Sequence, residues 1–133
     1  MSYKSPIEDF KYNLAMLNYD EVIAGIDKFK EYDSETLMSV VSEIGRLNEQ
    51  EVLDSNKIGD TEGLKYVTDG AEGPEVHTPE SFKKLYNAVK ASGYVGATMP
   101  IQYGGGGAPF TTAILAGEIG IACLLYTSPS PRD

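Results

Sequence analysis

The sequence has few of the residue types that build redox, metal and nucleophile sites. It contains one cysteine, Cys123, one histidine, His77, and no tryptophan. A single cysteine excludes a disulfide within the chain and any zinc or iron–sulfur site made from several cysteines. A single histidine offers no pair for a metal site, and no Ser-His-Asp or Cys-His arrangement can be assembled. His77 precedes Thr78 and Pro79 in a polar turn, so we expect it to be a solvated loop residue.

Basic residues are scarce as well, with 11 Lys+Arg against 20 Asp+Glu and a formal net charge of −9. Nucleic acids and anionic membrane surfaces repel such a chain, so we expect neither as a partner. No apolar run approaches the roughly 18 residues of a membrane span, and the first fifteen residues do not resemble a signal peptide. We therefore expect a soluble, cytoplasmic protein, and a chain of 133 residues has room for one domain.

The last eleven residues, CLLYTSPSPRD from Cys123 to Asp133, differ in character from the rest of the chain. Their alternating Ser and Pro residues are incompatible with a helix, and one interpretation is a Pro-rich linker or disordered tail. We favour another interpretation, because all eleven residues match a translation of the transposase adapter used in preparing sequencing libraries. On that interpretation residues 123–133 are foreign to the natural protein and the gene continues past Ala122.

Hydrophobic residues recur at helical spacing along most of the chain before Ala122, which predicts a helix-rich domain. We expect an N-terminal extension with short helices over residues 1–33 and a helical domain over residues 34–122. The expected helices span residues 7–17, about 20–29 with Asp20 as N-cap, 34 to about 54 with Asp33 or Ser34 as N-cap, 78–93 opened by Thr78 and Pro79 and ended by Gly93, and 111–122.

Three segments between these helices predict other structure. Residues 64–77 predict an extended loop or a small hairpin, residues 94–99 a strand-like connector, and residues 100–107 a glycine-rich loop. The apolar faces of the helices predict a common core that contains Leu37, Val40, Val41, Ile44, Phe82, Leu85, Tyr86, Val89, Ile114 and Leu115.

The run Gly104 to Gly107 suggests a phosphate-binding loop, but the required motifs are missing. No Gly-Lys-Ser/Thr follows it, and the G-x-G-x-x-G spacing of dinucleotide-binding folds fails, so we favour a structural turn. Acidic side chains between residues 43 and 54 favour a solvated helix face over a cation site. Glu118 lies near the apolar face of the last expected helix; we favour a capping or ion-pair role for it over catalysis.

Several segments, in order along the chain, resemble motifs of the flavin-dependent acyl-CoA dehydrogenases. The loop Pro100-Ile-Gln-Tyr103-Gly-Gly-Gly-Gly107 before a helix bearing Glu118 resembles the family's P-x-x-Y-G-G-x-G loop and its glutamate-containing helix. The resemblance extends to two further segments and to the opening residues, which are similar to the N-terminal extension of one branch of the family: Asn56-Lys-Ile-Gly59-Asp60-Thr-Glu-Gly63, Thr78-Pro79-x-x-Phe82-Lys83-x-x-Tyr86, and Tyr3-Lys4-Ser5-Pro6 with Asp9 and Phe10.

The resemblance covers residues 3–122 and implies an all-α N-terminal domain of a three-domain enzyme that dehydrogenates an acyl-CoA thioester. The β-barrel and C-terminal helical domains are missing here, and no residue of this chain matches the family's catalytic glutamate. The resemblance implies FAD, an acyl-CoA substrate, an electron acceptor such as an electron-transfer flavoprotein, and homo-oligomerisation for the full-length parent. It places Tyr103, Gly104, Gly105, Gly107 and Glu118 in a structural motif that can wall the acyl pocket, and it leaves the fragment itself inactive. A stand-alone acidic helical interaction module is the alternative.

Overall fold

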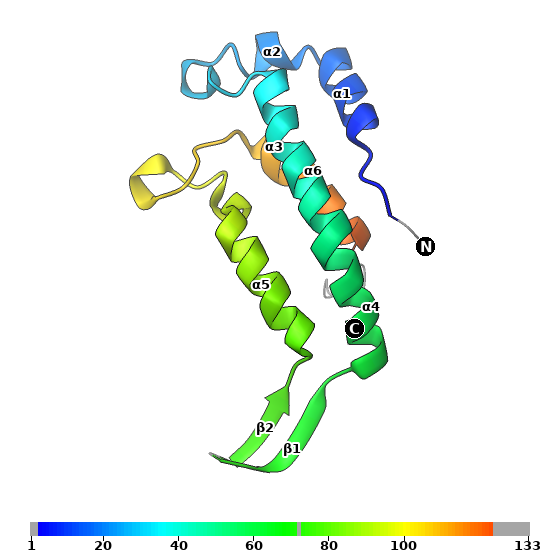
Figure 1. Ribbon diagram of the computed structural model, residues 1–133. Coiled ribbons are helices and arrows are strands. Elements are labelled where there is room, and N and C mark those ends of the chain that lie inside the picture. Colours follow the sequence, from blue (N-terminus) through cyan, green and yellow to red (C-terminus); the bar gives the residue numbers. More distant parts are fainter. Residues whose placement is uncertain (1–2, 72, 124–133) are drawn as a thin grey trace, which may run out of the picture.

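A long helical rod runs through most of the length of the molecule, in a computed structural model that describes residues 3–71 and 73–123 (Figure 1). The rod consists of α3 (Ser34–Leu47), a π-helical segment (Asn48–Val52) and α4 (Leu53–Glu62). The carboxylate of Asp33 accepts a hydrogen bond from the Thr36 N–H at 2.8 Å, which confirms the predicted N-cap. The segment interpreted as an adapter translation spans residues 123–133, and all of it except Cys123 lies outside the described residues.

The predicted end of this helix near Asp54 is wrong, because the rod continues to Glu62. Gly59 remains inside the helix, and the chain turns only at Gly63, whose φ of 63° is in a region that favours glycine. The π-helical turn joins α3 to α4 without a break in the rod.

The N-terminal extension forms α1 (Ile7–Met16), a single turn α2 (Tyr19–Val22) and a 3₁₀ turn at Asp27–Phe29. The prediction of one continuous helix over residues 20–29 is therefore wrong. The Asp20 carboxylate bonds forward to Ser34, accepting from its N–H at 2.6 Å and from its Oγ at 2.7 Å. Asp20 thus secures the start of α3 and does not cap a helix of its own.

An antiparallel hairpin follows the rod and extends beyond the helices (Figure 1). Its strands are β1 (Lys65–Gly70) and β2 (Gly73–His77), with Tyr66 opposite Val76. The structure therefore selects the hairpin from the two predicted alternatives. Of the residues that the structure describes, 66% are helical, which confirms the helical fold class with one short hairpin added.

Helix α5 (Glu80–Ser92) returns beside the rod and ends at Gly93 as predicted, with a φ of 71°. Pro79 is its N-cap, so the prediction of Thr78 as the cap and Pro79 as the first helical residue is wrong by one position. The prediction of a strand-like connector over residues 94–99 is also wrong. A 3₁₀ turn forms at Tyr94–Gly96, because the Gly96 N–H donates to the Gly93 carbonyl at 3.1 Å.

The last helix, α6 (Phe110–Cys123), packs against α3. The main core joins side chains from α1, α2, α3 and α6, namely Phe10, Leu14, Tyr19, Leu37, Met38, Val41, Leu115 and Ile119. Burial of large apolar side chains like these is the main force that holds the helices together.

The prediction that α5 contributes to this core is wrong. Helix α5 packs on α4 and the π-helical segment, whereas α3 packs against α1 and α6. Phe82, Leu85 and Val89 are therefore only half-buried, as is Val40 on α3, and Tyr86 is exposed. Ile114 on α6 is exposed as well, whereas Ile44 is buried as predicted.

Candidate functional site

The glycine loop, residues 100–107, carries four of the five residues singled out from the sequence. It opens with a 3₁₀ turn at Ile101–Tyr103 and continues through Gly104, whose φ is 83°. Gly107 has a φ of 69°. Residues with a β-carbon rarely adopt such angles, so the loop requires glycine at both positions.

Gly105 and Gly106 meet a different requirement, which is the close approach of two backbone segments. A β-carbon on Gly105 would collide with the backbone of Met99, and one on Gly106 would lie 2.7 Å from the Ala97 carbonyl oxygen. The loop therefore folds directly onto the connector that precedes it.

The amides of the loop donate to carbonyls of the same short segment. Gly105 donates to Pro100 at 3.2 Å, and Gly107 to Met99 at 2.9 Å. Gly106 and Ala108 donate to the Gly96 and Ala97 carbonyls at 3.1 and 2.9 Å. A phosphate-binding loop leaves its N–H groups free for the ligand, so this loop is a closed structural turn and does not fit the pyrophosphate of a flavin cofactor.

A groove of about 770 Å³ lies between α3, α5 and the glycine loop. Its walls include Val40 and Ile44 of α3 and Ala88 of α5, and Gly104 and Gly106 contribute backbone. These small and apolar groups can accept an apolar chain, whereas Ser39, Glu43, Arg46 and Ser92 make other parts of the wall polar.

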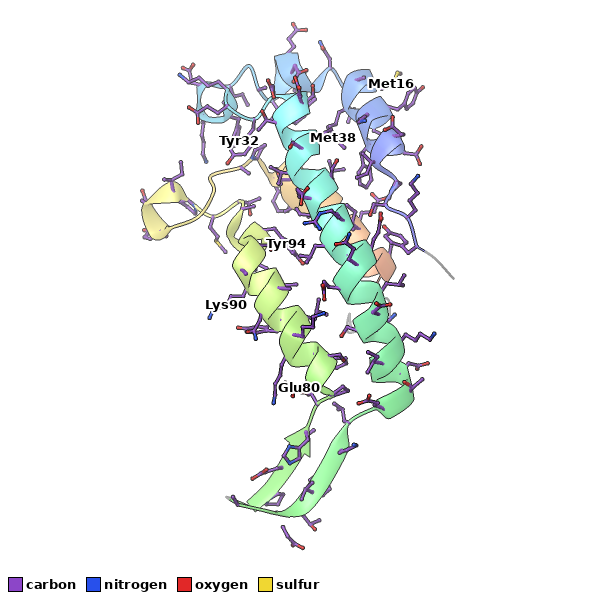
Figure 2. All side chains as sticks on the ribbon, viewed as in Figure 1. Met16, Tyr32, Met38, Glu80, Lys90 and Tyr94 are labelled. Carbon is purple, nitrogen blue, oxygen red and sulfur yellow. The ribbon has the colours of Figure 1, made fainter. Side chains whose placement is uncertain are left out.

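The side chain of Tyr94 stands at the end of α5 and points toward α3, on the border of this groove (Figure 2). Partial burial raises the pKa of its hydroxyl above the ordinary value. Tyr94 therefore stays neutral and able to donate a hydrogen bond over the physiological pH range.

Several apolar side chains on the connector, the loop and the start of α6 are exposed. Tyr103 is 79% exposed and Phe110 is 71% exposed, and the same holds for Val95, Met99, Ile101 and Ile114. Exposed apolar side chains concentrated on neighbouring segments are typical of surfaces that contact another domain, a partner or a ligand.

Glu118 is exposed on α6, so its predicted position near the apolar face of this helix does not bury it. Leu115 and Ile119 turn into the core, and the helical spacing directs the residue before Ile119 away from it. Within residues 3–71 and 73–123, Glu118 forms no ion pair. Glu118 also lies about 12 Å along α6 from Phe110, where the helix begins after the loop, so Glu118 and the glycine loop do not form one compact catalytic constellation.

His77 lies in β2, where its Nε2 is 3.2 Å from a carboxylate oxygen of Glu75. Its side chain is about half exposed, so it is solvated as expected, although it belongs to a strand and not to a loop. The described part of the chain brings no three His, Cys, Asp or Glu side chains together as a metal site. Within the same residues, every helix is too short or too polar to cross a bilayer.

Tyr32 was not predicted to belong to the site, yet its hydroxyl donates to the Gly106 carbonyl at 2.6 Å. Tyr32 lies in the polar break before α3, and its partner is 74 positions away. No local pattern could have revealed this contact.

Comparison with known proteins relates the chain to a short part of an acyl-CoA dehydrogenase. The relative is the 3-methylmercaptopropionyl-CoA dehydrogenase of Ruegeria pomeroyi, with 25% identity over 119 residues, or 90% of this chain. The chain spans only 19% of the length of that relative. No protein-family profile matches the chain.

Proposed function

We propose that this chain is the N-terminal helical segment of a flavin-dependent acyl-CoA dehydrogenase, an enzyme that introduces a double bond next to the thioester of an acyl-CoA. The observation that carries the proposal is the alignment with 3-methylmercaptopropionyl-CoA dehydrogenase across 90% of the chain. The helical fold supports it. An alignment of 119 residues includes the rod, α5, the glycine loop and most of α6, wherever in the chain it begins.

In this proposal the chain supplies one wall of the substrate pocket. The groove beside the glycine loop has a partly apolar wall, and the exposed apolar side chains around Tyr103 provide a surface for the rest of the enzyme. In this proposal the catalytic glutamate and the flavin site belong to domains outside this chain. The N–H groups of residues 103–107 donate to carbonyls of the same segment, which supports a flavin site elsewhere.

The same proposal includes the partners of the full-length parent. The substrate is an acyl-CoA thioester, and the electrons pass to an acceptor such as an electron-transfer flavoprotein. FAD is the cofactor of the parent, which is a cytoplasmic homo-oligomer.

Expressed alone, the chain is expected neither to retain FAD nor to oxidise an acyl-CoA. Flavin retention requires enclosure by several elements, and proton abstraction requires a carboxylate within hydrogen-bond reach of the substrate. Absorbance in the flavin region and an assay with acyl-CoA thioesters and an electron acceptor test this expectation. Stoichiometric flavin, or turnover that Glu118→Gln abolishes, would contradict it.

A stand-alone interaction module is the second candidate function. The exposed apolar side chains on the glycine loop and α6 favour it, because they suit a protein partner as well as a neighbouring domain. The gene distinguishes the two candidates: continuation past codon 122 into further domains supports the enzyme, and a natural stop supports the module.

A further inference from the structure

Tyr32 connects the N-terminal extension to the glycine loop. Its hydroxyl donates to the Gly106 carbonyl at 2.6 Å, and its own carbonyl accepts from the Tyr19 hydroxyl at 3.0 Å. These two bonds connect the core to the loop through Tyr32, one at its backbone carbonyl and one at its hydroxyl, and together we call them the relay. Figure 2 shows Tyr32 beside the start of α3.

Tyr19, which begins the relay in the N-terminal extension, is firmly fixed. Tyr19 is only 4% exposed and belongs to the main core, so its ring cannot move without disturbing α1 and α3. The next residue after Tyr32 is Asp33, the N-cap of α3, and Ser34 is bonded to Asp20. The backbone of Tyr32 is also held at its own N–H, which donates to the Phe29 carbonyl at 2.8 Å.

The loop end of the relay needs an external support. Four consecutive glycines have more backbone freedom than any other run of residues, and their own hydrogen bonds join them only to the neighbouring connector. Gly106 itself is exposed, so water can replace the Tyr32 hydroxyl at its carbonyl when the loop moves. Among the hydrogen bonds that the loop forms with described residues, the bond from Tyr32 is the one that comes from the N-terminal extension.

We propose that Tyr32 is a positioning residue that sets the conformation of the glycine loop, with Tyr19 as its anchor in the core. The N-terminal extension then stabilises the conformation of the loop through this residue. Its effect on an acyl pocket rests on the proposed function above, whereas its effect on the loop does not.

Hydrogen exchange measured by mass spectrometry on the full 133-residue chain tests this proposal. Tyr32→Phe keeps the ring and removes only the hydroxyl, so the chain is expected to fold. Loss of one hydrogen bond is expected to make exchange in residues 105–108 roughly fivefold faster, while residues 37–44 of α3 exchange as in the parent.

Two further variants complete the experiment. Tyr12→Phe is the matched control, because Tyr12 is 66% exposed on α1, and it should leave loop exchange unchanged. Tyr19→Phe, which removes the upstream bond, should accelerate loop exchange in the same direction and to a smaller extent. Unchanged loop exchange in Tyr32→Phe, or equal acceleration in the loop and in α3, would overturn the proposal. Because exchange reports loop order without any catalysis, this outcome is independent of whether the parent is an acyl-CoA dehydrogenase.

Discussion

The ring of Phe82 on α5 lies against Gly59 of α4, where a β-carbon would come within 2.6 Å of the ring's Cζ atom. This glycine is a point of close approach between two helices, and it lies inside α4, which ends only before Gly63. The ion pair between Lys84 and Glu51, at 2.9 Å, joins α5 to the π-helical segment farther along the rod.

Gly59→Ala is expected to give no gain in stability, although alanine is the better helix former by about 1 kcal/mol. The new methyl group displaces the Phe82 ring and loosens the contact of α5 with α4. Gly117→Ala on α6 is the matched control, since a β-carbon there meets nothing within 4 Å, and it should stabilise the chain by about 0.5–1 kcal/mol.

Urea unfolding of both variants, repeated in a Phe82→Ala background, measures this coupling. Without the ring, Gly59→Ala should become stabilising, as Gly117→Ala is. Equal stabilisation by the two alanines in the parent chain would show that the Phe82 contact is unimportant.

Two leucines on different helices test where the core lies. Leu37 is fully buried in α3, whereas Leu85 on α5 is only half-buried. Leu37→Ala should therefore lower the free energy of unfolding by about 2–5 kcal/mol, and Leu85→Ala by clearly less. Denaturant unfolding of the two variants gives the comparison, and a larger loss for Leu85→Ala would move the core toward α5.

The cap of α3 should make stability depend on acid pH. Hydrogen bonds from the Thr36 backbone N–H, and then from its side chain, hold the pKa of Asp33 below its ordinary value. A carboxyl group with a lowered pKa in the folded state contributes stability above its unfolded pKa, and that contribution is lost as the pH falls through the folded value.

Asp33→Asn keeps an oxygen that can cap the helix and removes the titration. The parent's stability advantage over this variant is therefore expected near neutral pH and should shrink below about pH 4. Asp69→Asn in the exposed hairpin controls for the loss of one negative charge. An advantage that stays constant from pH 6 to pH 2 would contradict the role given to the Asp33 carboxylate.

Local chemistry explains which features could be predicted from the sequence. The Asp33 cap and the stop at Gly93 depend on residues within one turn, so the sequence pattern was sufficient for both. The bond from Asp20 to Ser34 spans 14 positions, and here the local rule assigned the carboxylate to the wrong helix.

The partner of each apolar face was harder to predict than the face itself. The spacing of Phe82, Leu85 and Val89 correctly places them on one side of α5, but spacing contains no information on which helix they meet. The glycine loop was located correctly as well. Its closure by internal hydrogen bonds depends on the connector at residues 96–99, which was expected to be extended.

The most direct test of the central claim is the sequence of the gene itself, amplified from source DNA through and beyond codon 122. If the chain is the N-terminal segment of an acyl-CoA dehydrogenase, the reading frame continues past Ala122 with codons other than those for residues 123–133. It then enters sequence similar to the remaining four-fifths of the Ruegeria pomeroyi relative, of which this chain spans 19%. Codons for Cys123 to Asp133 followed directly by a stop would contradict the claim.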